Sequence, residues 1–281
     1  MTASLAVIFA GVLHATWNAI AKGAADRWAS VALIALGQSV LVLPLLPLVD
    51  LPAPAAWPWL VASVALHIGY MALLLKSYAL GDFNQVYPLA RGSAPLLVAV
   101  VAALFLGERL TLTQFAGVAA VCGGLAVLAF AGTLRGGARH DPRAIGAALL
   151  TGASIAGYTL LDGMGVRAAG DAVSYTVWLF GIEAPLTFLG VWAVRRGGLL
   201  EGTDRRQCAL GLAGGLFALA GYGIVLWAQT RGTLASVAAL RETGVISGAI
   251  IGAVFFAERM GFQRIAAACV VAAGVVLITV H

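Results

Sequence analysis

The chain has 281 residues, of which 61% are hydrophobic and only 10% are charged, and its mean hydropathy is +0.97. A soluble domain has about 25% charged residues, so this composition excludes an ordinary soluble globular protein. The formal net charge of +5 bears only on membrane topology, and three isolated cysteines predict neither a disulfide framework nor a metal site.

The apolar runs are long enough to cross a bilayer as helices, which needs roughly 20 residues each. Barrel strands would alternate apolar and polar residues, whereas these runs are continuous. The first run begins near Ala3 with no Lys or Arg before it, so we interpret it as a retained helix and not a signal peptide. Charged and turn residues then predict ten spans, at 3–21, 29–49, 57–80, 84–106, 112–131, 144–161, 172–194, 208–228, 233–257 and 262–280.

Two spans share a sequence pattern at a constant offset. Arg91 lies 150 positions before Arg241, and Glu108-Arg109 lies 150 positions before Glu258-Arg259. Phe105 and Phe255, and Gly124 and Gly274, match at the same offset. Four matches at one offset predict a duplicated unit of five helices.

An odd number of helices per unit places the second unit in the membrane in the opposite sense. The predicted fold class is therefore an all-α integral membrane protein, with ten transmembrane helices in two inverted five-helix repeats. We expect the first repeat over 1–133, a linker over 134–143 and the second repeat over 144–281.

The motif Leu106-Gly107-Glu108-Arg109, continued to Gly117 and Gly123-Gly124, resembles the EamA-type repeats of the drug/metabolite transporter superfamily. Its second copy runs from Ala257 to Gly274, with Ala257 and Ala267 in place of glycines. The resemblance implies a central cavity lined by spans one, three, four, six, eight and nine, with the fifth and tenth spans at the periphery. The segment His14–Asn18 is similar to a subgroup of permeases whose genes lie near phosphonate-utilisation genes.

Membrane topology receives two opposing predictions. The resemblance implies that both termini lie in the cytoplasm. Loops after odd-numbered spans, however, hold eleven Lys and Arg residues, and loops after even-numbered spans hold three. By the positive-inside rule, the eleven belong in the cytoplasm and both termini outside.

Charged residues inside spans are the strongest candidates for a role in transport. Placing each charge in the membrane costs about 2.5–3.5 kcal/mol on insertion scales, so such residues are by default interpreted as functional. Arg91 and Arg241 lie well inside their helices at equivalent positions of the two repeats. Two guanidinium groups would bind a carboxylate, phosphonate or phosphate. The alternative is a structural role, in which each arginine satisfies helix carbonyls or pairs with Glu242. We expect no single acidic residue to neutralise both arginines.

Polar and aromatic residues at helical spacing would shape the same site, although packing or an interfacial aromatic belt explains each of them equally well. The predicted substrate-binding residues are Arg91, Arg241, Tyr87, Trp17, Asn18, His14, Tyr70, Tyr158 and Tyr222. Candidates for coupling are Glu242, Glu183 and Asp162, although Asp162 lies near a predicted span end and would then be solvated. Gly244, Gly248 and Gly252 form a small-residue stripe that we expect to cross the fourth span.

Enzyme motifs are absent from the sequence, since the four histidines are scattered and there is no H-E-x-x-H, G-x-S-x-G or C-x-x-C. We therefore predict a permease of the inner membrane, with no cofactor, no metal and no nucleic-acid partner. Its substrate would be a small anionic or zwitterionic metabolite, such as an amino acid, organic acid or phosphonate, and a coupling proton is one option. A passive channel, an efflux pump for cationic or aromatic compounds and an intramembrane enzyme are the alternatives, and the chain would act as a monomer or a homodimer.

Overall fold

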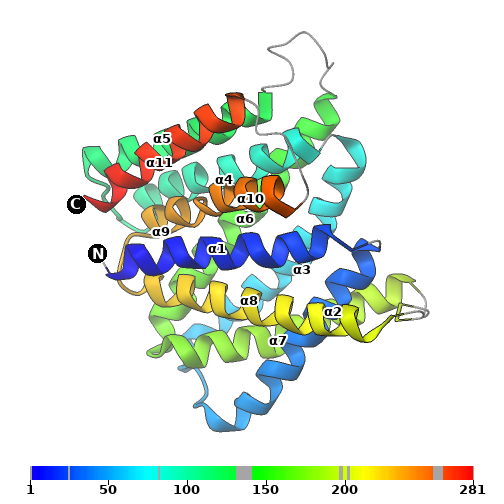
Figure 1. Ribbon diagram of the computed structural model, residues 1–281. Coiled ribbons are helices and arrows are strands. Elements are labelled where there is room, and N and C mark those ends of the chain that lie inside the picture. The colour runs from blue at the N-terminus through cyan, green and yellow to red at the C-terminus, as the bar shows by residue number, and fades with distance from the viewer. Residues whose placement is uncertain are drawn as a thin grey trace.

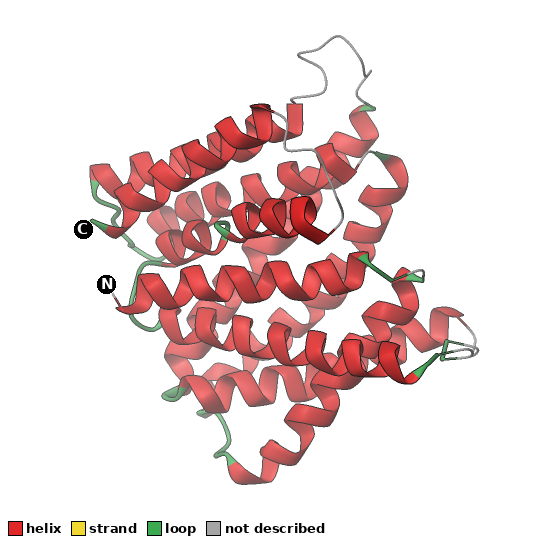
Figure 2. Cartoon of the chain, in the orientation of Figure 1, coloured by secondary structure: helices red, strands yellow, loops and turns green. Residues whose placement is uncertain are grey.

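A computed structural model describes residues 2–24, 26–81, 83–130, 141–195, 199–200, 203–255 and 262–280. All regular elements in these ranges are helices (Figure 2). Most of the predicted linker, together with Glu258 and Arg259 of the second motif copy, lies outside the described residues.

The first repeat region contains five α-helices and two short 3₁₀ segments. They are α1 (Thr2–Lys22), α2 (Arg27–Val42), η1 (Leu43–Leu48), η2 (Pro54–Ala56), α3 (Trp57–Leu80), α4 (Phe83–Phe105) and α5 (Leu112–Phe130). The second predicted span thus ends in a 3₁₀ segment, because Pro44 and Pro47 lack the backbone N–H that an α-helix needs. The other four spans match their predicted bounds within one residue.

The described residues of the second repeat region form six α-helices where five spans were predicted. They are α6 (Pro142–Ala169), α7 (Ala172–Arg195), α8 (Arg205–Gln229), α9 (Leu234–Arg241), α10 (Gly244–Phe255) and α11 (Phe262–Thr279). The ninth span is therefore two helices, separated at Glu242 and Thr243. Within the described residues, eight helices are long and apolar enough to cross a membrane, and α11 contains a shorter apolar stretch over Ile265–Thr279.

Helix α6 is longer than predicted, because Asp162 does not end the span. The helix continues to Ala169, and the Asp162 side chain is fully buried. The prediction that this carboxylate is solvated is wrong. Tyrosine hydroxyls from two other helices satisfy it, and the sequence around it gives no sign of those long-range partners.

The helices pack as pairs that repeat across the bundle. Helix α1 lies along α8, and α3 lies along α6. Helix α4 also packs on α6, whereas α9 and α10 pack on α1. Helices α5 and α11 pair with each other at one edge of the bundle, and α1 begins at the same end of the molecule where α11 finishes (Figure 1).

Helices approach each other closely at glycines, which have no side chain to separate the backbones. Gly117 of α5 faces the carbonyl of Gly274 on α11, and Gly124 faces the carbonyl of Ala267. Gly244 of α10 faces the carbonyl of Gly11 on α1, and Gly248 lies beside Ala15 of the same helix. Gly244 and Gly248 of the predicted stripe therefore contact α1 and not the fourth span as predicted, because the break after Arg241 separates the contacts of α9 with α4 from those of α10 with α1.

Candidate functional site

The break between α9 and α10 positions two charged residues inside the bundle. The backbone N–H groups of Glu242 and Thr243 bond to carbonyls three residues earlier, Ala239 and Leu240, at 3.1 Å each. The Thr243 hydroxyl also donates to the Leu240 carbonyl at 2.8 Å, and Gly244 has a low helix propensity. These local features favour a tightened turn over a continuous α-helix.

This turn places Arg241 and Glu242 each beside a helix end whose partial charge is opposite to that of the side chain. Arg241 lies in the last turn of α9, whose C-terminus carries a partial negative charge. Glu242 lies two residues before Gly244, the first residue of α10, and a helix N-terminus carries a partial positive charge. Each helix end therefore stabilises the charge beside it in an otherwise apolar environment.

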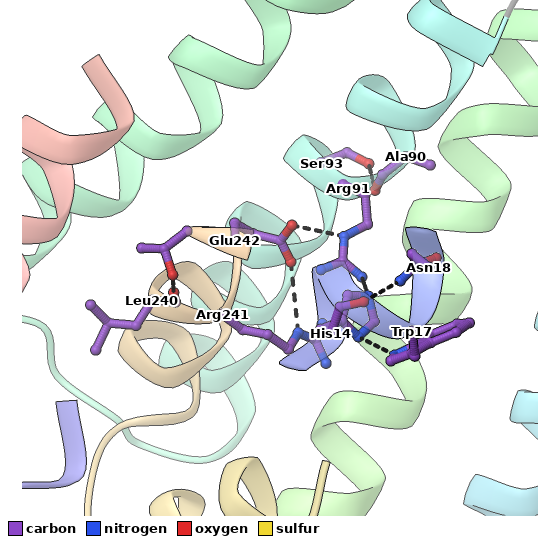
Figure 3. Close-up of polar contacts among 10 residues, drawn as sticks. His14, Trp17, Asn18, Ala90, Arg91, Ser93, Leu240, Arg241 and Glu242 are labelled. Atoms are coloured by element: carbon purple, nitrogen blue, oxygen red, sulfur yellow. Dashed lines mark hydrogen bonds and ion pairs between the residues drawn. The ribbon is translucent and has the colours of Figure 1, made fainter. Parts of the chain in front are cut away.

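Glu242 lies between the two predicted arginines (Figure 3). Its Oε2 accepts a hydrogen bond from Arg91 Nε at 2.8 Å, and its Oε1 lies 3.7 Å from Arg241 Nε. Both arginines are 3% exposed and Glu242 is 0% exposed. The prediction that no single acidic residue is placed near both arginines is wrong, because the helix break brings Glu242 to a position that a continuous helix would not give it.

Arg241 is incompletely paired. Its Nε and Nη2 atoms are buried, and neither has a hydrogen-bond partner among the described residues. The same holds for Glu242 Oε1, since 3.7 Å is too long for a hydrogen bond. A buried donor edge and a buried acceptor atom therefore lie close together without a hydrogen bond between them.

His14 of α1 connects this group to an indole ring. Arg91 Nη1 lies 3.1 Å from His14 Nε2, and Trp17 Nε1 lies 3.2 Å from His14 Nδ1 (Figure 3). Arginine and tryptophan side chains only donate, and a neutral imidazole has a single accepting nitrogen. His14 can therefore accept from only one of these two neighbours at a time.

A second polar group forms around Asp162, between α6, α7 and α8. Asp162 accepts hydrogen bonds from the hydroxyls of Tyr175, at 3.1 Å, and Tyr222, at 2.5 Å. Glu183 of α7 is partly buried and lies within electrostatic range of Asp162 and His67. Two acidic side chains therefore lie in this part of the interior, apart from the two arginines.

Aromatic rings lie between the two charged groups. The ring of Tyr158 stacks on His67 with centroids 4.0 Å apart, and meets Tyr70 edge-on at 5.6 Å and Tyr222 at 6.3 Å. Tyr158 is also within electrostatic range of both Arg241 and Asp162. These rings provide an apolar surface with polar edges between the two arginines and the acidic side chains of Asp162 and Glu183.

The structure brings the predicted residues together in two groups. His14, Trp17, Arg91, Arg241 and Glu242 form one, with Tyr87 close to Arg91, whose guanidinium lies 6.0 Å from the ring centroid. Tyr70, Tyr158, Tyr222, Asp162 and Glu183 form the other. Asn18 also lies on α1, but its amide donates to the His14 carbonyl at 2.8 Å and so bonds its own helix.

Tyr175 and His67 were not among the site residues predicted from the sequence. A single tyrosine near the start of an apolar span has no distinguishing neighbour pattern, so the Tyr175 hydroxyl could be placed only through its contact with Asp162. His67 lies four residues after Ser63, whose hydroxyl and carbonyl are 3.2 Å and 3.0 Å from His67 Nδ1. That polar spacing on one helix face was the available signal.

Comparison with known proteins agrees with this architecture. The model of the EamA-like transporter family matches residues 1–130 and again residues 142–280. One crystal structure shares the fold with a TM-score of 0.75, covering 99% of this chain and 96% of that chain at 17% sequence identity. No curated protein sequence matches the chain.

The chain is a multi-pass membrane protein of a transporter class, as its apolar helices and the two matched regions show. It belongs to the EamA-like transporter family. The resemblance inferred from the Glu108-Arg109 motif is confirmed, and the members of this family are transporters of small molecules and not enzymes.

Proposed function

We propose that this protein is an alternating-access permease of the inner membrane that moves a small anionic or zwitterionic metabolite. The observation that carries the proposal is the buried group formed by Arg91, Glu242 and Arg241 inside an apolar helix bundle. Each intramembrane charge costs about 2.5–3.5 kcal/mol on insertion scales. A group of three such charges is expensive for packing alone and is suited to binding a charged substrate.

The helix contacts support an inverted repeat as the scaffold for alternating access. A two-fold axis that exchanges the halves would convert the pair α1–α8 into α6–α3, and α4–α6 into the packing of α9 and α10 on α1. It would also convert the contact between Gly117 and Gly274 into that between Gly124 and Ala267, because these positions exchange at the offset of 150. All of these contacts are present.

Glu242 supports coupling to protons in this scheme. A substrate anion beside Arg241 would bring a second negative charge close to the Glu242 carboxylate, and a proton taken up by that carboxylate would offset the repulsion. Asp162 and Glu183 are the other coupling candidates, since both carboxylates lie inside the bundle away from the arginines.

Transport by purified protein in liposomes tests the proposal. In Arg91→Gln, uptake of anionic and zwitterionic metabolites should be lost. In Glu242→Gln, binding of a simple anion such as acetate should be retained, but uptake should no longer respond to a proton gradient. Arg231→Gln serves as the matched control, because Arg231 is exposed and stacks on Trp227 at 4.3 Å. Normal transport by Arg91→Gln would make that arginine structural and would exclude the anionic substrate class.

A second candidate function is efflux of cationic or aromatic compounds. The aromatic rings of Tyr158, Tyr222 and His67 beside Asp162 favour it, because aromatic faces and a carboxylate attract cations. Flux of an aromatic cation that survives Arg91→Gln but is lost in Asp162→Asn would support this function over the first. A passive channel, by comparison, would show unitary currents without saturation.

A further inference from the structure

We propose that Arg241 and Glu242 together form a subsite for an oxyanion that carries an N–H or O–H donor on a neighbouring atom, and that Arg91 is a positioning residue. This inference rests on the proposed transport function and deepens it by assigning the atoms that bind substrate. It separates the roles of two arginines that the sequence pattern treats as equivalent.

Arg241 presents a free donor edge. Two atoms have no partner in the described part of the chain, Nε and Nη2, and in a planar guanidinium these two nitrogens share one edge. Their N–H bonds point in parallel, which is the geometry that binds two oxygens of one carboxylate, phosphonate or phosphate. Leaving such donors buried and unbonded costs free energy, so a ligand that supplies two acceptors is strongly favoured here.

Glu242 presents the complementary acceptor. Its Oε2 is occupied by Arg91, whereas its Oε1 is buried and unbonded among the described residues. Because Oε1 lies 3.7 Å from Arg241 Nε, a single ligand group can reach both residues. The ligand must then offer acceptors to Arg241 and a hydrogen to Glu242, which an oxyanion alone cannot do.

Arg91, by contrast, already has partners on several sides. Its Nε donates to Glu242, its Nη1 lies 3.1 Å from His14 Nε2, and its guanidinium lies near the ring of Tyr87. These contacts hold the Glu242 carboxylate with Oε1 turned toward Arg241. Arg91 therefore acts on the substrate through Glu242, and we expect its replacement to disturb binding less than a change at Arg241.

Titration calorimetry on purified full-length protein tests this assignment with five probes. Alanine and lactate carry a carboxylate beside an N–H or O–H donor, and the monoanion of methylphosphonate carries both on one group. Acetate supplies the oxyanion alone, and methylamine supplies the donor alone. We expect at least one of the first three to bind about tenfold or more tightly than acetate and methylamine, since a hydrogen bond to a charged group contributes on that order. The probe that binds shows whether the donor to Glu242 is an ammonium N–H, an alcohol O–H or the O–H of the oxyanion itself.

Variants that retain charge separate the two arginines. Arg241→Lys keeps the positive charge but lacks the parallel donor edge, so affinity for the bifunctional probes should fall about tenfold or more. Arg91→Lys should lower it by less, and Arg231→Lys is the control for a loop arginine. Size-exclusion profiles and unfolding temperatures establish that each variant is folded, and Glu242→Gln gives an independent test because it should abolish the preference for lactate and alanine over acetate.

Three results would overturn the assignment. The first is an unchanged affinity of Arg241→Lys for the bifunctional probes. The second is equal affinity of the wild-type protein for acetate and for the bifunctional probes. The third is that the wild-type protein binds no oxyanion probe at concentrations up to the millimolar range. Liposome flux distinguishes this failure from failure of the proposed function. Flux of any metabolite from a mixed library that persists in Arg241→Lys would leave the transporter intact and reject only the subsite, whereas no flux in the wild-type protein would reject the function itself.

Discussion

Among the individual residues, Glu242 is the one that joins the two halves of the chain at the site. Its partner Arg91 lies 151 positions away, and its neighbour Arg241 lies beside it on the broken ninth span. Removing one member of a buried ion pair leaves an uncompensated charge, which costs roughly 3–5 kcal/mol. The group is therefore expected to be sensitive to any neutral substitution and more tolerant of changes that keep charge.

The hydrogen bonds of Asp162 lead to a prediction about stability. Tyr222→Phe should lower the free energy of unfolding by about 1–3 kcal/mol, because it leaves one oxygen of a buried carboxylate without its donor. Tyr175→Phe should act in the same direction, and the double variant should deviate from additivity because both hydroxyls bind one side chain. Thermal unfolding in detergent measures the effect. Tyr70→Phe is the control, since it removes a hydroxyl from another tyrosine of the same aromatic group, which meets the Tyr158 ring edge-on. Equal unfolding temperatures for Tyr222→Phe and this control would contradict the prediction.

Among the helices, the contact between α1 and the break in the ninth span determines how closely the two repeats approach. Gly11 of α1 lies against Thr243 and Gly244, so its missing side chain allows backbone-to-backbone packing. Small residues at such crossings are typical of helix pairs in membranes. The crossing holds the turn that carries Arg241 and Glu242.

Gly11→Ala tests this contact. A β-carbon there would lie 2.8 Å from the Thr243 hydroxyl oxygen and 2.9 Å from the Gly244 nitrogen. Overpacking of this kind costs about 1–3 kcal/mol, so we expect a lower unfolding temperature and reduced transport. Gly69→Ala on α3 is the matched control, because nothing lies within 4 Å of the added carbon and alanine favours a helix over glycine. A neutral or stabilising effect of Gly11→Ala would show that α1 moves away from the turn without cost.

The first motif copy also has a structural role between elements. Glu108 Oε1 pairs with Arg167 of α6 at 2.8 Å, and Glu108 Oε2 accepts from the Leu234 N–H at the start of α9 at 2.8 Å. Arg167 additionally donates to the carbonyls of Gln229 and Gly232. This loop glutamate therefore connects α6 and α9 at one end of the bundle.

Glu108→Gln should weaken that connection modestly. The ion pair is partly exposed, with Arg167 36% accessible, so its loss is expected to cost at most about 1 kcal/mol. High salt should reduce the difference between the variant and the wild-type protein, because screening weakens exposed charge pairs. Unfolding temperatures at low and high ionic strength provide the measurement, and a salt-independent loss would attribute the effect to the helix cap instead.

At the scale of the whole molecule, the distribution of charge predicts orientation in the membrane. Helix α1 begins and α11 ends on the same side of the bundle (Figure 1). In the sequence, the loops after odd-numbered predicted spans carry eleven of the seventeen Lys and Arg residues, against three in the loops after even-numbered spans. The charge count therefore favours termini outside the cytoplasm.

A reporter fused after His281 decides the orientation. We expect a periplasmic reporter to be active and a cytoplasmic one to be inactive, because eleven basic residues outweigh three. Moving charge between the loops, by adding lysines on the side of the termini, should weaken or reverse this result. An active cytoplasmic reporter in the unmodified protein would show that the family topology prevails over the charge count.

The sequence by itself predicted the limits of most of the helices that the structure describes, because a helix in lipid must satisfy its own backbone and its hydropathy is a local property. It also located the two arginines, since charges inside apolar runs are conspicuous. Only the tertiary structure decided that the ninth span breaks at Glu242, that this carboxylate lies between both arginines, and that Asp162 is buried beneath Tyr175 and Tyr222. Those features depend on partners far apart in the chain, and local periodicity carries no information about which helix faces will meet.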